Sequence, residues 1–138
     1  MTRRTVLWLS AHPERHSLNA TLRGDGLRHL SSHGVRVLES DLYAMEWNPV
    51  VTRADAGIPE EERFRVSSDT RRAYTEERLP EDVRAEQAKL RQADAVVVQF
   101  PLWWYGMPAI LKGWFDRVFI SGFAFGKDPA TGRRLRYE

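Results

Sequence analysis

A polar loop near the start of the sequence, SAHPERHSLN at residues 10–19, contains side chains that can bind an anion. His12, Ser17 and Asn19 all offer hydrogen-bond donors, and Ser17 is a good N-cap for a helix that starts at Leu18. The free backbone N–H groups and the dipole at such a helix N-terminus favour a phosphate. The loop follows neither the GxxxxGK[ST] nor the GxGxxG pattern, so histidines that merely pack at a helix cap are an equally good interpretation of this segment taken alone.

A second unusual loop, PLWWYGMP at residues 101–108, sets three large aromatic residues side by side. They are Trp103, Trp104 and Tyr105, and Gly106 follows at once. Their grouping fits neither helix nor strand periodicity, which favours a stacking surface for a planar ligand over simple filling of the core. A flavin nucleotide requires a phosphate-binding helix terminus beside an aromatic surface. We therefore predict a flavin site built from these two loops.

The elements around the first loop predict a β-α-β unit. Residues 5–9 are a short apolar run that is typical of a strand, and leucines at helical spacing follow the loop as far as His33 and Gly34, where the helix should end. Residues 35–43 then supply a second strand. Because the connection in such a unit is almost always right-handed and parallel, we expect these two strands to lie parallel in one sheet.

A third strand and its helix enclose the aromatic loop. Residues 94–100, DAVVVQF, form a nearly unbroken apolar run, which is typical of a parallel strand that is covered on both faces. Pro108 then starts a helix that runs to about residue 120 with a wide apolar face. We expect a doubly wound α/β sheet in the strand order 2-1-3. Ligands bind such sheets beyond the carboxyl ends of the strands where the winding reverses, and the two loops follow the first and third strands, which meet there.

A long polar excursion at residues 44–79 separates the second strand from the next helix, and we expect a partly ordered arm with a helical turn near residues 69–74. The next helix should run from Pro80 to about Ala93, and the tail after the last helix should be loop. This arrangement leaves the apolar strand at 94–100 on an edge of the sheet. We therefore expect either a second chain or the later strands of a longer domain to cover that edge.

The composition of the 138 residues limits the classes of function. A hydrophobic content of 42% suffices for one core, so we predict a single domain over residues 1–138. No apolar run approaches the roughly 20 residues that cross a bilayer, and we expect a cytoplasmic protein without membrane insertion. The absence of cysteine excludes thiol nucleophiles and disulfides. The 21 basic and 19 acidic residues are spread along the chain, which argues against nucleic acid as a partner.

Other polar and aromatic residues have plainer explanations. His29 and His33 lie one helical turn apart, but no carboxylate or cysteine partner is evident, so we predict surface histidines and no metal site. In the last helix we expect the aromatic residues in the core and the charged residues solvated or paired on the opposite face. The aromatic residues are Trp114, Phe115 and Phe119, and the charged ones are Lys112, Asp116 and Arg117.

Five segments of the sequence resemble consecutive blocks of one enzyme family. In chain order they are AHPERHSLN, ESDLYAMEWNPV, AEQAKL, QFPLWWYGMPAILKGWFDRVF and GFAF. Their order and spacing are similar to those of the NAD(P)H quinone oxidoreductases of the DT-diaphorase type, which have the flavodoxin-like fold. The resemblance implies a homodimeric enzyme that binds FAD, takes hydride from NADH or NADPH, and reduces quinones by two electrons in a ping-pong cycle. The sequence does not distinguish FAD from FMN, or NADH from NADPH.

The resemblance also implies roles for individual residues. Those expected to hold the FAD phosphates and adenosine are His12, Ser17, Leu18 and Asn19. Those expected to contact the isoalloxazine ring are Leu102, Trp103, Trp104 and Tyr105. Trp104 and Tyr105 are expected in addition to wall the shared nicotinamide and quinone pocket, and we predict them as the catalytic residues. Those expected to contact substrate are Ala124, Phe125 and Gly126.

The chain departs from the family in three respects. The family often has a polar residue at the position of Trp103, and it offers FAD a glutamine where this chain has Arg65. The family also continues well beyond this length, with a Thr-Thr-Gly-Gly turn and a Tyr/His pair that complete the flavin site. We therefore expect the chain to be the N-terminal portion of such a domain. Two alternatives remain open: a regulatory flavoprotein subunit of a potassium efflux system, which shares the architecture, and an inactive truncated fragment.

Overall fold

The structure is a computed structural model that describes residues 3–127 and 130–134. Strands and helices follow one another in the predicted order, with one short 3-10 helix, η1, in the arm. The elements are β1 (Thr5–Ser10), α1 (Leu18–Ser32), β2 (Arg36–Asp41), η1 (Arg53–Ala56), α2 (Val66–Thr75), α3 (Glu81–Gln92), β3 (Ala95–Gln99) and α4 (Ala109–Val118).

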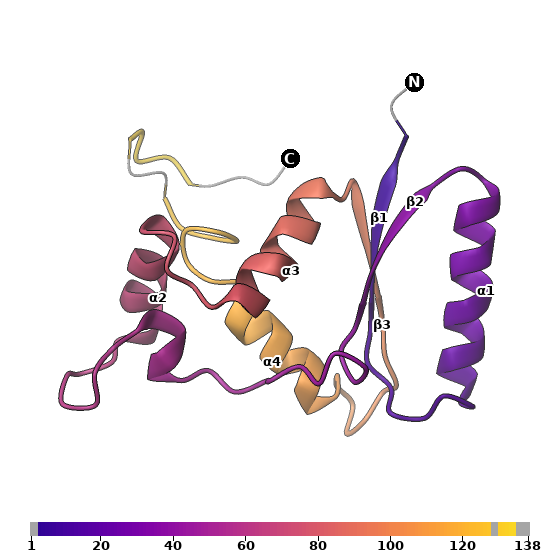
Figure 1. Cartoon of the computed structure of the whole chain (residues 1–138), viewed down its shortest axis with the longest axis horizontal. Helices are drawn as coiled ribbons and strands as arrows, with labels where there is room; N and C mark the ends of the chain where they lie inside the picture. The colour runs from indigo at the N-terminus through magenta and orange to yellow at the C-terminus, as the bar shows by residue number, and fades with distance from the viewer. Residues whose placement is uncertain (1–2, 128–129, 135–138) are drawn as a thin grey trace.

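The three strands form one parallel sheet in the order β2-β1-β3, which confirms the predicted topology. Thr5 of β1 lies opposite Arg36 of β2, and Val6 lies opposite Ala95 of β3, so the strands end at the same edge of the sheet. The loops after β1 and β3 begin side by side at this edge (Figure 1), and the amide of the residue after β1 donates a hydrogen bond to Gln99 O at 3.1 Å. The two predicted ligand loops are therefore neighbours.

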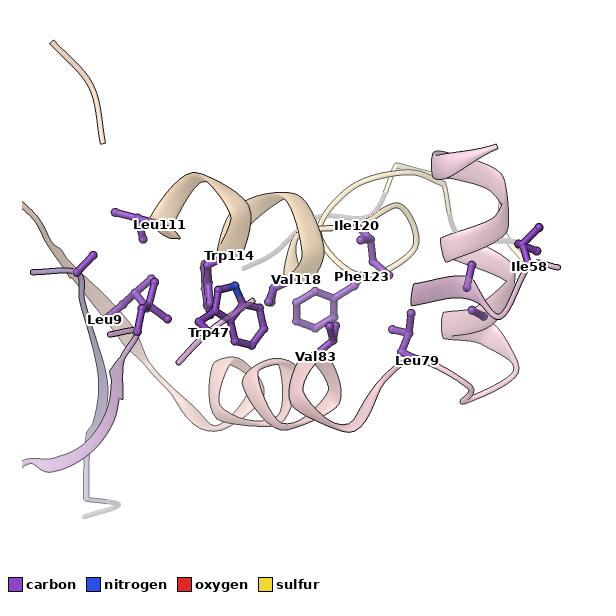
Figure 2. Packing of buried hydrophobic residues seen from close by; sticks show 14 residues of the cluster. Leu9, Trp47, Ile58, Leu79, Val83, Leu111, Trp114, Val118, Ile120 and Phe123 are labelled. Atoms are coloured by element: carbon purple, nitrogen blue, oxygen red, sulfur yellow. The ribbon is translucent and has the colours of Figure 1, made fainter. Parts of the chain in front are cut away.

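Helices cover both faces of the sheet. α1 lies on one face, α3 and α4 lie on the other, and α2 lies beyond them (Figure 1). The core fills the space between the sheet, α3 and α4, where Leu9, Val83 and Trp114 are almost completely removed from water (Figure 2). Each such side chain contributes about 1.5–3 kcal/mol of stability through burial. This core fixes the positions of β1, β3 and α4, which carry the two loops.

α1 starts as predicted but has no buried residue. Ser17 Oγ accepts a hydrogen bond from Ala20 N at 3.1 Å, which confirms the predicted N-cap. The indole of Trp8 lies against Gly26, where a Cβ atom would come within 2.2 Å of the ring. Gly26 therefore lets the helix approach the sheet closely, at the cost of about 1 kcal/mol of helix propensity.

A buried carboxylate joins α3 to the sheet and to α4. Glu86 accepts hydrogen bonds from Ser40 Oγ at 2.6 Å and from Trp114 Nε1 at 2.9 Å, and Lys89 Nζ donates to its other oxygen at 2.6 Å. Both carboxylate oxygens are thus satisfied, as a buried charge requires. Because Trp114 belongs to α4, these bonds hold the helix that follows the aromatic loop.

The arm at residues 44–79 is more ordered than its sequence predicts. It contains η1 and a ten-residue α2, which is longer than the helical turn expected near residues 69–74. Thr52 and Asp55 form a capping box at the start of η1, with Thr52 N donating to the Asp55 carboxylate at 2.8 Å. An ion pair between Asp55 and Arg117 of α4 attaches η1 to the core.

Arg117 of α4 was expected to be solvated or paired on the face opposite the core. It is paired, but it is buried, so its expected place on a solvent-facing side is wrong. Its guanidinium donates to Asp55 at 2.7 Å, to Asp82 at 2.6 Å and to Asn48 O at 3.0 Å, and it lies over the ring of Trp47. Burial lowers the pKa of Arg117, but the hydrogen bonds and charges of the two carboxylates outweigh burial, so this pKa is raised above its ordinary value. Asp55 and Asp82 are 62 and 35 residues away along the chain, so local sequence patterns do not reveal this cluster.

The outer side of β3 has no covering element among residues 3–127 and 130–134. There β3 pairs only with β1, and Val96 remains 43% exposed. Trp114 and Phe115 pack in or against the core as predicted, but Phe119 is 38% exposed, so its predicted burial is wrong. Phe119 lies beside the open side of β3 and lines, with Val96 and Phe123, a hollow of about 560 Å³.

The described part of the chain contains neither a helix suited to crossing a membrane nor a cluster of metal ligands. No helix there combines the length and apolar character needed to cross a bilayer. Within the same residues, no three His, Cys, Asp or Glu side chains are grouped so that they could hold a metal ion. His29 and His33 lie with ring centroids 4.4 Å apart on the exposed side of α1.

Candidate functional site

The loop after β1 is held by hydrogen bonds within the loop itself. Glu14 N donates to His12 Nδ1 at 3.0 Å, and His16 N donates to the Glu14 carboxylate at 2.8 Å. Ser17 Oγ donates to Glu14 O at 2.8 Å, so the Ser17 hydroxyl is engaged both as donor and as helix cap. Since Nδ1 of His12 accepts a hydrogen bond, the neutral ring carries its proton on Nε2, which stays available to a ligand.

These residues border a hollow of about 380 Å³ at the carboxyl edge of the sheet. His12, Asn19 and Arg23 line it, together with Gln99 of β3. Arg23 Nε is buried and has no hydrogen-bond partner within the described residues, although another nitrogen of the same guanidinium is paired with Glu39. An unsatisfied buried N–H costs about 1–3 kcal/mol, so a ligand oxygen at this point is favourable. With the N-terminus of α1, these donors fit an anionic phosphate group.

Two carboxylates also line this hollow, and each already accepts a hydrogen bond from the backbone. Glu14 accepts from His16 N, and Asp41 accepts from Ala44 N at 3.2 Å. Asp41 in addition lies 3.9 Å from Arg23 Nη1. Both negative charges are therefore partly offset by the protein itself.

Gln99 connects the two loops at the base of this hollow. Its side-chain oxygen accepts a hydrogen bond from Trp8 Nε1 at 3.0 Å, and its side-chain nitrogen donates to Asn19 O at 2.8 Å. The first turn of α1 is thereby tied to the end of β3, where the aromatic loop begins. No role was predicted for Gln99 from the sequence, although a polar residue at the end of an apolar strand was a signal that could have revealed one.

The aromatic loop forms a two-residue turn. Trp103 N donates to Gly106 O at 2.9 Å, and Gly106 N donates back to Trp103 O at 3.0 Å. Between them, Trp104 and Tyr105 have φ angles of 48° and 59°. Such a left-handed backbone costs a residue with a Cβ about 1–2 kcal/mol, and turns with two positive φ angles usually hold Asn-Gly.

Trp104 and Tyr105 also extend fully into solvent, with 97% and 95% of their surface exposed. Backbone strain and exposure of two large rings are both unfavourable to the chain alone, and strain of this kind is concentrated at ligand sites. Trp103 connects this turn with the first loop, because its ring centroid lies 6.2 Å from that of His12. The remaining predicted contacts are also exposed: Leu18 is the first residue of α1, and Leu102 lies in the aromatic loop.

The predicted substrate loop lies elsewhere in the molecule. Ala124, Phe125 and Gly126 follow α4, whereas the aromatic turn precedes it, and a ten-residue helix is about 15 Å long. The segment packs near α2, where Arg71 Nη2 donates to Lys127 O at 2.7 Å (Figure 1). One chain therefore brings together the residues of the first two loops but does not bring residues 124–126 to them.

The fold and the position of this site define a class of protein. The family described as having a flavodoxin-like fold matches residues 4–137, and the chain belongs to this family. The flavodoxin-like assignment made from the sequence blocks is confirmed.

Individual relatives narrow the comparison to quinone-reducing enzymes. The chain is 47% identical to NAD(P)H dehydrogenase (quinone) 1 of Rattus norvegicus, over 91% of this chain and 46% of the relative. It is 43% identical to ribosyldihydronicotinamide dehydrogenase (quinone) of Homo sapiens, over 91% of this chain and 55% of the relative. A solved structure of a putative quinone reductase from Klebsiella pneumoniae matches with a TM-score of 0.86 and 46% identity, over 91% of this chain and 49% of that one. The chain spans about half the length of the curated relatives it matches.

Proposed function

We propose that the chain supplies the flavin-binding portion of an NAD(P)H:quinone oxidoreductase. In this proposal FAD lies across the loops that follow β1 and β3, NADH or NADPH donates hydride, and a quinone accepts two electrons in a ping-pong cycle. The observation that carries the proposal is the strained and fully exposed turn of Trp104 and Tyr105, placed beside the loop of His12. The similarity to named quinone enzymes supports it.

Bound flavin would accept hydride from the nicotinamide and pass it to the quinone. The chain's own residues would bind and orient the reactants. His12 Nε2, Arg23 Nε and the N-terminus of α1 would hold the phosphate, with Leu18 and Asn19 beside the adenosine part. Trp104 and Tyr105, whose backbone directions are fixed by the turn, would wall the pocket for both flat substrates. FMN would use the same phosphate donors and leave the adenosine contacts empty.

A homodimer belongs to the same proposal. Residues 124–126 lie beyond the far end of α4 from the aromatic turn, so they can share a substrate with that turn only if a second copy supplies them. The full exposure of Trp104 and Tyr105 is consistent with a partner surface. We place this dimer in the cytoplasm, as the sequence predicts.

The alternative of a regulatory subunit of a potassium efflux system is not favoured. The relatives with 43–47% identity carry the names of quinone dehydrogenases, and the similar solved structure is titled a putative quinone reductase. No observation on the described residues supports a transporter partner.

The test is oxidation of NADH and NADPH by a water-soluble benzoquinone, with purified protein and added FAD. We expect turnover that needs flavin and falls about tenfold or more in Trp104→Ala/Tyr105→Ala, since aromatic walls orient both substrates. Leu22→Ala removes an exposed apolar side chain from α1 and serves as the matched control. Flavin binding without turnover would support the fragment alternative, and absence of both would contradict the proposal.

A further inference from the structure

The segment after α4 turns back on itself in a short loop, residues 120–126. Gly122 N donates to Phe125 O at 2.7 Å, and Ala124 N donates to Ile120 O at 2.9 Å. Gly122 has a φ angle of 91°, which glycine adopts readily and a residue with a Cβ does not. These features fix the shape of the loop, but other contacts must attach it to the rest of the molecule.

The two phenylalanines of this loop have opposite environments. Phe123 is only 5% exposed, and its ring lies among the buried side chains of the core (Figure 2), whereas Phe125 is 52% exposed. A ring stabilises the fold in proportion to the apolar area that it removes from water. Phe123 therefore anchors the loop, and Phe125 is the ring that the loop presents to its surroundings.

A guanidinium from α3 completes the anchor. Arg91 Cζ lies 5.2 Å from the ring centroid of Phe123 and 5.9 Å from that of Tyr74 in α2. The two rings meet edge to face with centroids 6.0 Å apart, and Arg91 Nη2 donates to Tyr74 Oη at 3.2 Å. A cation within about 6 Å of an aromatic face is attracted to it. These three side chains, the Arg91 cluster, thus join α2, α3 and the loop.

Arg91 differs in this respect from the other arginine of its helix. Arg84 forms an ion pair with Glu81 on the surface of α3. Arg91 forms no ion pair with any residue that the structure describes, so the two aromatic rings and the tyrosine hydroxyl are its partners. A charge placed in this way serves to hold the rings together.

α2 holds the loop at a second point. Arg71 Nη2 donates to Lys127 O at 2.7 Å, just beyond the loop. A Cβ on Gly122 would lie 3.3 Å from both Arg71 Cγ and Tyr74 Cδ1, so helix and loop are in close contact there. Arg71 and Tyr74 are three residues apart and therefore share one face of the helix. The loop is fastened to α2 by this face and to α3 by Arg91.

We propose that Arg91 is a positioning residue: by holding Tyr74 and Phe123 together, it keeps residues 120–126 in one conformation, with Phe125 in a fixed place. Arg91 itself touches no substrate in this account. The consequence for catalysis rests on the proposed function, in which residues 124–126 contact substrate. The attachment of the loop by Arg91 does not depend on that function, so the two can be tested separately.

The first test is amide hydrogen exchange of the purified chain, followed by NMR. Arg91→Met keeps a long side chain but removes the charge, and it should speed exchange of Gly122 N, whose bond to Phe125 O closes the loop, about fivefold or more, since two cation–π contacts and a hydrogen bond are lost. Amides of β1 should exchange at the wild-type rate. The matched control is Arg84→Met, which removes the arginine paired with Glu81 and should change neither. Equal exchange of Gly122 N in the wild type and Arg91→Met overturns the inference, as does an equal increase in β1.

Substitutions of Tyr74 separate this role from a simpler one. Arg91 lies in the last turn of α3, where any cation interacts favourably with the helix dipole. That effect does not involve Tyr74, whereas the proposal predicts that Tyr74→Leu speeds exchange of Gly122 N as much as Arg91→Met does, and adds little to it in the double variant. Tyr74→Phe keeps the ring and should restore most of the protection. Unchanged exchange in Tyr74→Leu overturns the inference.

The second test is steady-state quinone reduction with added flavin. Arg91→Met should raise KM for the quinone about fivefold and leave kcat nearly unchanged, since a loosened loop weakens contacts made equally before and during the reaction. Partial unfolding would instead lower kcat at an unchanged KM, and that result contradicts a positioning role. Absence of turnover in the wild type would refute the proposed function, and the exchange measurements would still decide whether Arg91 holds the loop.

Discussion

Replacement of Trp104 and Tyr105 by asparagine and glycine should make the protein more stable while removing its proposed function. Both residues occupy positive φ angles in a two-residue turn whose backbone suits Asn-Gly. Their side chains are almost fully exposed, so the replacement removes little buried surface. The double variant therefore separates the stability of the fold from the binding role of the two rings.

The size of the gain follows from the backbone. Each left-handed residue with a Cβ costs about 1–2 kcal/mol, so the two together cost about 2–4 kcal/mol. Glycine at the second position reduces this gain in stability by about 0.5–1 kcal/mol, because glycine loses more conformational entropy on folding than other residues do. We expect the free energy of unfolding to rise by about 1–3 kcal/mol.

The assay is urea unfolding of flavin-free protein, followed by far-UV circular dichroism. The control is Trp104→Ala/Tyr105→Ala, which removes the rings but keeps a Cβ at both strained positions. It should have nearly the stability of the wild type and the same loss of quinone reduction as the Asn-Gly variant. An Asn-Gly variant that is no more stable than the alanine variant would refute the assignment of strain to this turn.

Three further substitutions test the packing. Gly113→Ala should lower the free energy of unfolding in urea by about 3 kcal/mol or more, since the new Cβ would lie 2.1 Å from the backbone of the arm. The control, Gly24→Ala on exposed α1, should raise it by about 0.5–1 kcal/mol. Similar values for the two variants would contradict the close contact at Gly113. Arg117→Met should cost about 3–5 kcal/mol because a buried carboxylate loses its partner, and Lys112→Met, in an exposed pair, at most about 1 kcal/mol. Val96→Lys should reduce self-association in sedimentation velocity, and an unchanged distribution would show that the open side of β3 is not the contact.

Local patterns were sufficient to predict the fold and the proximity of the two loops that follow β1 and β3. The apolar run at 94–100 predicted β3, and Ser17 before a leucine-rich segment predicted the start of α1; the structure confirms both. The aromatic loop was recognised because its composition fits no regular element. Two parallel strands ending at one edge then placed that loop beside the loop of His12, which the structure confirms.

Features that depend on distant parts of the chain were not predictable in the same way. The pattern of its helix predicts a surface position for Arg117, but its burial depends on aspartates 62 and 35 residues away. Phe119 has the spacing of a core residue but faces the open side of β3, so the periodic pattern was misleading. The unpaired, buried Arg23 Nε results from three-dimensional packing, which no sequence pattern encodes.

The central claim is that the loops after β1 and β3 together hold a flavin. Titration of FAD with the purified chain, followed by quenching of flavin fluorescence, tests it most directly. We predict saturable binding of FAD in equimolar amount, weakened roughly tenfold or more by His12→Ala and by Trp104→Ala/Tyr105→Ala, since each removes a hydrogen bond or a stacking surface from one loop. Absence of saturable binding, or equal affinity in the wild type and both variants, would contradict it.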